Sequence, residues 1–380
     1  MKKYDIITKT LFGFEELLAT ELRALGATNI EVLNRAIKCS GGQELLYKIN
    51  LLSRTALRVL VPIATFTASN EDKLYKKIRD IDWSTYIGVD QTFAIDATTH
   101  SEIFNHSKYA ALKCKDAIAD QFRDKTGRRP SVNTEDPDLR INVHIADKLV
   151  NIALDSSGEH LDRRSYRLSR TEAPINEVLA AGIILMTGWD GKSHFIDPMC
   201  GSGTFAIEAA MMASHRPPGM FRHFAFEKWS DFDARLWRKI RAEAEANICS
   251  PTSKIVANDM DAHAVSMARQ NAARAGVDKL ITFANQDFLA THSEAGAGVV
   301  VMNPPYGERL QHDDLNAFYT EIGTRLKHFY EGFDAWIISA DLRALKFIGL
   351  RPSRKVALFN GSLECRLHKF ELYSGSMKEK

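Results

Sequence analysis

Paired cysteines, long apolar runs and an excess of charge of one sign are all missing from this 380-residue sequence. The few cysteines and the histidines lack the spacing of zinc sites or of a disulfide framework. No apolar run reaches the ~18 residues that a membrane span needs, and the N-terminus is too polar for a signal peptide. The net charge of +2 does not by itself indicate a nucleic-acid partner, so any basic surface must be local. These absences predict a cytoplasmic protein with reduced thiols, no bound metal and no membrane partner.

Composition and the order of elements indicate a globular protein of two or three domains. Apolar residues make up 45% and charged residues 26% of the chain, and single domains commonly hold about 100–200 residues. The first third mixes short strands and helices in an α+β pattern. After a boundary near 163–171, apolar strands alternate with helices, which predicts a parallel sheet buried on both faces. Asn360-Gly361 predicts a final antiparallel hairpin.

Three segments of the second part place glycines and acids directly after predicted strands: FIDPMCGSGTFAIEAA, VANDMD and FANQDF. Gly201 and Gly203 let the backbone pass close under a ligand, but their spacing is that of neither nicotinamide enzymes nor nucleotide triphosphatases. Asp259 suits the two hydroxyls of a ribose and Asp287 an adenine amine, whereas Asp261 suits the N-cap of the next helix. Since the carboxyl ends of consecutive strands share one edge, the set favours a nucleoside cofactor without phosphates, S-adenosylmethionine.

The segment VVVMNPPYGERL ends a predicted strand with two residues that cannot donate to a sheet. The prolines stiffen the turn, so the Asn303 Oδ1 atom and the Pro304 carbonyl are two acceptors for the protons of one exocyclic amine. Such an amine is a poor nucleophile, and holding it promotes transfer through positioning and electrostatics. Tyr306 would stack on the base. Taken alone, the segment is equally consistent with a plain turn.

These motifs together resemble class I S-adenosylmethionine-dependent methyltransferases of the amino-group type. Segments such as GRRPSVNTEDPDLRINVHI and EAPINEVLAA are similar to THUMP-containing bacterial ribosomal RNA large-subunit methyltransferases, and the resemblance covers nearly the whole chain. It implies a ferredoxin-like domain over 1–60, a THUMP RNA-binding domain over 61–165 and a Rossmann-like methyltransferase domain over 166–380. It also implies transfer of a methyl group to guanine N2. Ser165 departs from the resemblance, because a glycine is expected there.

The resemblance assigns roles to residues of this sequence. The target base is expected to contact Asn303, Pro304, Pro305 and Tyr306. The cofactor is expected to contact Asp197, Met199, Gly201, Gly203, Thr204, Asp259, Met260, Asp287 and Phe288. A local basic cluster is expected to contact RNA phosphates, unless it is a solvated, charge-balanced face; it comprises Arg128, Arg129, Arg163, Arg164, Tyr166 and Arg167.

Four readings of the function stay open at this point. The first is guanine-N2 methylation of large-subunit ribosomal RNA or of an assembly intermediate, with transfer RNA as a second substrate class. The same NPPY geometry also serves DNA adenine-N6 methylation and methylation of a glutamine amide in a protein. The last reading is an RNA-binding protein with a vestigial pocket. The THUMP-like half disfavours the DNA and protein readings, and the intact Asn303 and glycines disfavour the vestigial one.

Overall fold

The computed structural model describes residues 3–167, 175–292, 296–305 and 312–373. The contacts between these residues divide the chain into two compact units. Unit 1 holds the chain up to Thr10, residues 18–161 and residues 222–242. Unit 2 holds residues 11–17, 162–221 and the chain from Glu243 onward. Each unit therefore combines segments that lie far apart in the sequence.

Unit 1 is built on a mixed sheet in which the described residues form eight strands, in the order β2-β3-β1-β4-β8-β7-β5-β6. Its strands are β1 (Lys3–Thr10), β2 (Thr28–Leu33), β3 (Ala36–Gly42), β4 (Ala56–Thr67), β5 (Thr92–His100), β6 (Ser131–Val132), β7 (Leu139–Ala146) and β8 (Leu149–Asp155). Its helical elements include α2 (Gln43–Leu52), α3 (Glu71–Arg79), η1 (Trp83–Thr85) and α4 (Ser107–Thr126), while α1 (Glu15–Ala24) belongs mostly to it. Strands β7 and β8 form an antiparallel hairpin, and Asp147 in its turn has a φ value of 51°.

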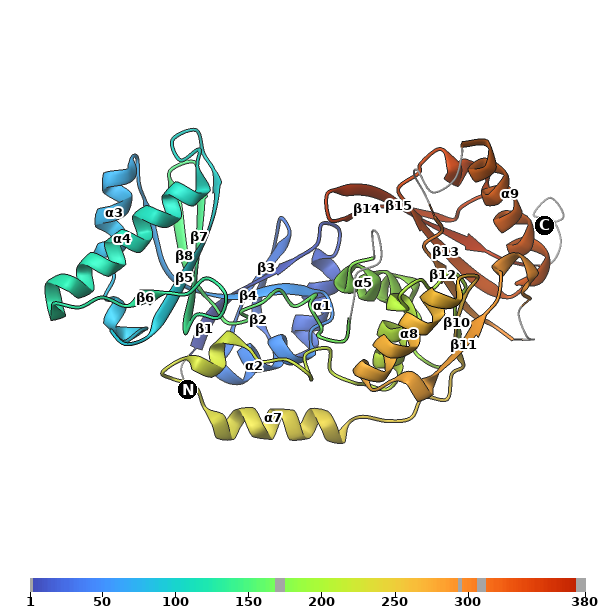
Figure 1. Cartoon of the computed structure of the whole chain (residues 1–380), viewed down its shortest axis with the longest axis horizontal. Coiled ribbons are helices and arrows are strands. Elements are labelled where there is room, and N and C mark those ends of the chain that lie inside the picture. The colour runs from blue at the N-terminus through green and yellow to red at the C-terminus, as the bar shows by residue number, and fades with distance from the viewer. Residues whose placement is uncertain (1–2, 168–174, 293–295, 306–311, 374–380) are drawn as a thin grey trace. The chain divides into compact units, whose positions relative to one another are not determined.

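The long strand β4 joins the two halves of this sheet. It pairs antiparallel with β1 on one side and with β8 on the other, and its register shifts between Pro62 and Ala64. Apolar faces of α3 and α4 cover β5, β7 and β8 in one core around Trp83 (Figure 1). The ferredoxin-like and THUMP-like parts therefore share one continuous sheet.

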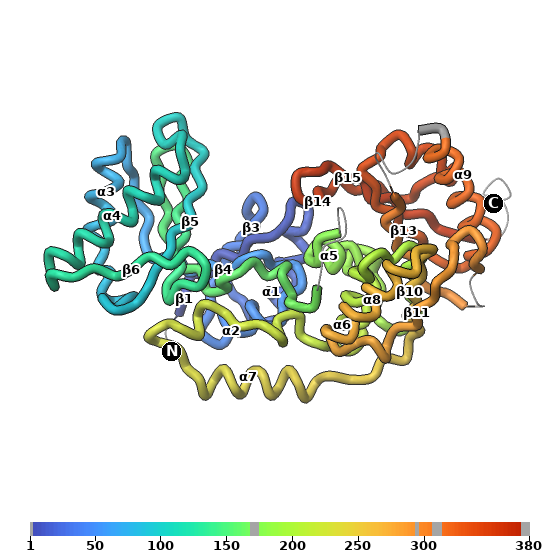
Figure 2. The backbone as a smooth tube through the Cα atoms, viewed as in Figure 1, coloured from blue at the N-terminus to red at the C-terminus, as the bar shows by residue number. Residues whose placement is uncertain are grey.

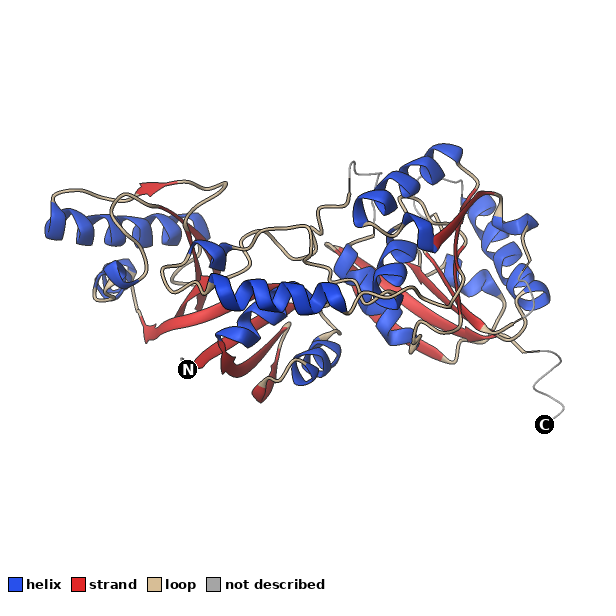
Figure 3. Cartoon of the chain, turned by 90° about the horizontal axis from the view of Figure 1, so that it is seen from below, coloured by secondary structure: helices blue, strands red, loops and turns tan. Residues whose placement is uncertain are grey.

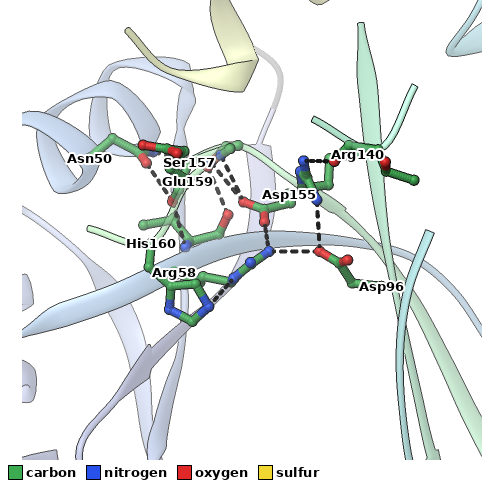
Figure 4. Close-up of polar contacts among 12 residues, drawn as sticks. Asn50, Arg58, Asp96, Arg140, Asp155, Ser157, Glu159 and His160 are labelled. Atoms are coloured by element: carbon green, nitrogen blue, oxygen red, sulfur yellow. Dashed lines mark hydrogen bonds and ion pairs between the residues drawn. The ribbon is translucent and has the colours of Figure 1, made fainter. Parts of the chain in front are cut away.

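A network of charged side chains around Arg58 of β4 ties the strands of unit 1 together (Figure 4). Arg58 pairs with the fully buried Asp155 and with Asp96, which also accepts a hydrogen bond of 3.1 Å from Arg140. The second oxygen of Asp155 accepts the backbone amide of Ser157 at 2.9 Å. Because burial raises the pKa of Asp155 while Arg58 opposes the rise, this carboxylate depends on its partners.

Unit 2 is a doubly wound sheet with helices on both faces (Figure 3). The described residues form seven strands in the order β11-β10-β9-β12-β13-β15-β14. Strand β15 is antiparallel to both of its neighbours, β13 and β14, and the other neighbouring pairs are parallel. The strands are β9 (His194–Asp197), β10 (Ile255–Asp259), β11 (Ile281–Asn285), β12 (Gly298–Met302), β13 (Phe333–Ser339), β14 (Arg354–Asn360) and β15 (Leu363–Glu371). The helices are α5 (Glu177–Thr187), α6 (Thr204–Ala213), α8 (Ala262–Ala275) and α9 (His312–Phe329), with the short η3 (Asp278–Leu280), η4 (Phe288–Ala290) and η5 (Ala344–Ile348). The predicted Rossmann-like fold and the hairpin at Asn360-Gly361 are confirmed.

Residues 222–242 leave unit 2 and return to unit 1 (Figure 2). This segment contains η2 (Ala225–Lys228) and most of α7 (Ala234–Ala246). The ring of Phe226 stacks on Tyr47 of α2 at 4.3 Å, and the ring centroid of Trp237 lies 5.1 Å from that of Phe226. Arg222 donates to the backbone carbonyls of Ser157 and Glu159 after β8. The aromatic rings of this segment are buried, so the segment packs as part of the core of unit 1.

Candidate functional site

The parallel strands of unit 2 bring the predicted site residues to one edge of the sheet. Asp197 and Asp259 are the last residues of β9 and β10, Asp287 follows β11 by two residues, and Asn303 follows β12 directly. The ladder pairs β9 with both β10 and β12, and β10 with β11. This is the edge at which open α/β sheets bind ligands.

The loop after β9 has the backbone that its glycines predict. Gly201 and Gly203 have φ values of 51° and 83°, in the left-handed region that favours glycine. A Cβ atom on Gly203 would lie 2.9 Å from the Cβ atom of Ala268 in α8, so this glycine also permits close helix packing. The amide of Cys200 donates to the Asn258 carbonyl at 2.8 Å, which fixes the loop against β10.

Asp259 supports the glycine loop directly. Its Oδ2 atom accepts the amide of Gly201 at 2.8 Å, and its Oδ1 atom accepts the amide of Asp261 at 3.0 Å. Asp261 itself caps α8 through the amide of His263, which confirms its predicted role as an N-cap. Asp259 remains half-buried, and each carboxylate oxygen retains acceptor capacity for a further donor.

Asp197 is a buried acid with no hydrogen-bond partner in the part of the chain that the structure describes. Its side chain is 1% exposed, and neither oxygen has a hydrogen bond in the described part of the chain. Burial and the neighbouring Asp259 carboxylate raise the pKa of Asp197 well above its ordinary value. The amides of Met199 and Ala206 act in the opposite direction, but they lie outside hydrogen-bonding geometry. Such a group is suited to a cationic or protonated partner supplied from outside the protein.

The other residues expected at the cofactor differ in exposure. Met260 is 73% exposed at the end of β10, whereas Thr204 and Phe288 are buried and Met199 is half-buried. The exposed Asp287 caps η4 by accepting the amide of Leu289 at 2.9 Å. Phe288 packs in the core under β12 and β13, with its ring centroid 5.6 Å from that of Tyr330.

The NPPY segment is described only in part. Asn303 follows the buried Met302 and is half-buried, as is Pro305, whereas Pro304 between them is buried. Tyr306 lies outside the described residues, so its stacking role stays a prediction. The three described residues stand at the end of β12, beside the strand β9 whose loop carries the glycines.

Two of the six residues expected to contact RNA are not on a surface. Arg164 and Tyr166 are 3% and 2% exposed, because both side chains turn inward onto Glu208 of α6. Arg164 Nε donates to Glu208 Oε1 at 2.9 Å, and the Tyr166 hydroxyl donates to the same oxygen at 3.1 Å. Their assignment to RNA is therefore corrected, since a linker arginine can satisfy a buried acid as well as a phosphate. Arg128, Arg129 and Arg163 are exposed, with Arg128 paired to Asp90, and Arg167 is half-buried.

Ser165 adopts the conformation for which a glycine is expected. Its φ value is 66°, in the left-handed region that costs an L-residue roughly 1–2 kcal/mol. Ser165→Gly is therefore expected to raise the free energy of unfolding by up to about 1 kcal/mol, because greater unfolded-state entropy offsets part of the relief. Urea denaturation measures it, and Ser165→Ala is the control that keeps the strain. A loss of stability in the glycine variant would show that the strain is already compensated.

The buried acid Glu208 was missed by the sequence reasoning. It is 0% exposed within the apolar helix TFAIEAAMMA, where an isolated Glu is itself a signal of a buried partner. Asn271 was missed in the same way; its Nδ2 atom donates to the Ser202 carbonyl at 3.0 Å and fixes the glycine loop to α8. Asn271 therefore holds the glycine loop, whereas Glu208 holds the linker residues Arg164 and Tyr166.

Two features are absent from the described part of the chain. No group of three His, Cys, Asp or Glu side chains there is arranged to hold a metal ion. No helix among those residues is both long and apolar enough to span a membrane.

Models of three protein families match the chain in succession. An RlmL ferredoxin-like domain matches residues 5–60, a THUMP domain matches residues 68–155, and an RMKL-like methyltransferase domain matches residues 164–369. The last match alone covers more than half of the chain.

Relatives and solved structures agree with these matches. The Synechocystis sp. protein slr0064, provisionally named an RNA methyltransferase, is 39% identical over 364 residues, which cover 95% of each chain. The structure of SMU.472, a provisionally named methyltransferase solved with S-adenosylhomocysteine, is 28% identical with a TM-score of 0.89 and covers 99% of this chain and 100% of its own. A Listeria monocytogenes structure provisionally named an N6-adenine-specific DNA methylase is 28% identical with a TM-score of 0.88, over 98% and 97% of the two chains.

These names differ in the nucleic acid that they give, but they agree on methyl transfer. The neighbour with S-adenosylhomocysteine identifies the cofactor as S-adenosylmethionine, in accord with the glycine loop and the acids at the sheet edge. The chain belongs to the family of THUMP-containing, RlmL-like class I S-adenosylmethionine-dependent RNA methyltransferases.

Proposed function

We propose that the protein transfers a methyl group from S-adenosylmethionine to the exocyclic N2 amine of a guanine in large-subunit ribosomal RNA. The observation that carries the amine as target is the position of Asn303 and Pro304 at the end of β12, beside the β9 loop on the same sheet edge. The succession of ferredoxin-like, THUMP and methyltransferase matches supports ribosomal RNA. The proposal includes domains over 1–60, 61–165 and 166–380, and a cytoplasmic location.

The chain's own residues would hold the two reactants by different chemistry. Asn303 Oδ1 and the Pro304 carbonyl would accept the two amine protons and so orient the nitrogen lone pair. Asp259 would accept the ribose hydroxyls, and Asp197, which has no partner among the described residues, would accept the ammonium group of the methionine moiety. When bound, S-adenosylmethionine supplies the methyl group. Arg128, Arg129 and Arg163 would contact RNA phosphates.

The proposal is tested by product analysis with the full chain. The protein is incubated with labelled cofactor and with unmodified large-subunit ribosomal RNA, transfer RNA or DNA, and the methylated nucleoside is identified after digestion. We expect N2-methylguanosine from the ribosomal RNA. N6-methyladenine in DNA would replace the proposal by the alternative that shares the NPPY geometry, and N2-methylguanosine in transfer RNA alone would change the substrate.

Asp259→Ala is expected to weaken binding of S-adenosylhomocysteine by about 10–100-fold, because charge-assisted hydrogen bonds are worth roughly 1.5–3 kcal/mol. RNA affinity should stay within about twofold, since the loop lies at the sheet edge of unit 2. Calorimetry measures the cofactor and filter binding measures the RNA. Asp261→Asn, which keeps the N-cap of α8, is the matched control. Unchanged affinity in the Ala variant would remove Asp259 from the ribose role.

A further inference from the structure

Arg167 was expected to contact RNA, but its side chain turns into unit 2. The guanidinium Nε atom donates to Glu177 Oε1 at 2.8 Å, and the Nη2 atom donates to the Ile175 carbonyl at 3.0 Å and to Thr204 Oγ1 at 3.1 Å. The side chain is only 13% exposed. Glu177 and Thr204 are the first residues of α5 and α6, so the guanidinium lies between two helix N-termini.

One donor atom of this guanidinium is left over. Arg167 Nη1 is buried and has no hydrogen-bond partner within the described ranges. A buried donor on a charged group is costly to leave unpaired, so the lack of an acceptor among the described residues points to a partner from outside the protein. The planar fork of an arginine matches a carboxylate or a phosphate.

The electrostatic surroundings favour an anion at this position. The N-termini of α5 and α6 both present the positive ends of their helix dipoles. Glu177 pairs with the Nε side of the guanidinium, which leaves the Nη1 atom on the other side for a second acceptor.

Asp197 lies at the same turn of α6. The amides that act on its carboxylate belong to Met199 in the loop and to Ala206, two residues after Thr204. Beside the first turn of α6 there are therefore a buried acid and a buried arginine donor that both lack a hydrogen-bond partner among the described residues. The ligand that satisfies both is one with a cationic and an anionic group close together, as in an α-amino acid.

We propose that Arg167 binds the carboxylate of the methionine moiety of S-adenosylmethionine through Nη1, while Asp197 receives the ammonium group. Arg167 thus belongs to the cofactor site and not to the RNA surface. The inference rests on cofactor binding alone and does not depend on which nucleic acid is methylated.

The test compares two ligands that differ in the amino-acid moiety. Calorimetry gives the Kd of S-adenosylhomocysteine, which carries the carboxylate, and of 5′-methylthioadenosine, which lacks it. Arg167→Gln is expected to raise the Kd of S-adenosylhomocysteine by about 10–100-fold and to leave that of methylthioadenosine within about twofold. Arg167→Lys, which keeps the charge but not the fork, should show a smaller loss confined to the same ligand.

Arg274→Gln is the matched control. Arg274 Nη2 also bonds the linker, at 3.0 Å to the Ser165 carbonyl, but its side chain is exposed on α8. This variant should bind both ligands as the wild type does. Equal losses for the two ligands in Arg167→Gln would mean that Arg167 only supports the loop, and unchanged binding of both would exclude contact; either result overturns the proposal. If Arg167→Gln does not fold, the ratio of the two Kd values in Arg167→Lys decides by the same criterion.

Discussion

Asn303→Ala is expected to slow single-turnover methylation by about 10²–10³-fold, which is the usual cost of removing one preorganised polar group aimed at the reacting centre. Asn303 stands directly after β12, where it is half-buried and followed by the buried Pro304. A water molecule therefore cannot easily take the place of the amide that the substitution removes. With the Oδ1 atom removed, the Pro304 carbonyl alone would hold the target amine. Its lone pair would then no longer be directed at the methyl group.

The binding steps should change little in this variant. Affinities for S-adenosylhomocysteine and for RNA are expected to stay within about threefold, because the acceptor contributes mainly in the transition state. Asn303→Asp, which keeps one acceptor oxygen of the same shape, should retain more activity than Asn303→Ala. A wild-type rate in the Ala variant would reduce the NPPY segment to the end of a strand, and a loss confined to RNA affinity would make Asn303 a binding group only.

The cofactor edge of unit 2 could be predicted because its signals are local. A parallel strand buried on both faces is a short apolar run, and the loop that follows it must carry the polar ligands. The residue type alone indicated positive φ values at Gly201 and Gly203 and a helix start at Asp261. Glu208 and Asn271 act through long-range contacts, and the sequences of their helices do not identify which residues they will contact.

The return of residues 222–242 to unit 1 could not be predicted, because no local pattern states which core an amphipathic aromatic segment enters. The segment reads equally well as the wall of a channel, and its contacts with Tyr47 and the backbone after β8 exist only in the fold. One consequence concerns fragments. A chain of residues 166–380 would carry Phe226 and Trp237 without the ring of Tyr47, against which both pack in unit 1.

The basic cluster of the linker is a second case in which local sequence could not predict the contacts of the side chains. Residues Arg163 to Arg167 form one basic segment in the sequence, yet successive side chains alternate between exposed and buried positions. Arg163 is exposed, whereas Arg164 lies against Glu208 with side-chain exposures of 2% and 0%. Burial and the Glu208 carboxylate hold the pKa of Tyr166 well above its ordinary value, so its hydroxyl keeps the proton that it donates to Glu208.

Arg164→Met is therefore expected to lower the free energy of unfolding of unit 2 by about 3–5 kcal/mol, the usual cost of leaving one partner of a buried ion pair uncompensated. The hydrogen bond from Tyr166 cannot replace a full charge beside Glu208 Oε1, and Glu208 Oε2 already lacks a partner in the described part of the chain. Urea denaturation followed by circular dichroism measures the loss.

The double variant Arg164→Met/Glu208→Leu separates this buried role from a contact with RNA. Removing both charges should recover most of the stability, since well-packed apolar replacements of buried ion pairs are often neutral or better. RNA affinity of the double variant should equal that of the wild type within about twofold, because Arg164 has no surface to offer a phosphate. Arg163→Gln, from the exposed neighbour, should instead weaken RNA binding and reduce its salt dependence by about one phosphate contact. If the double variant is stable but binds RNA as weakly as Arg163→Gln does, Arg164 reaches RNA after all, and the buried pair is only one of its conformations.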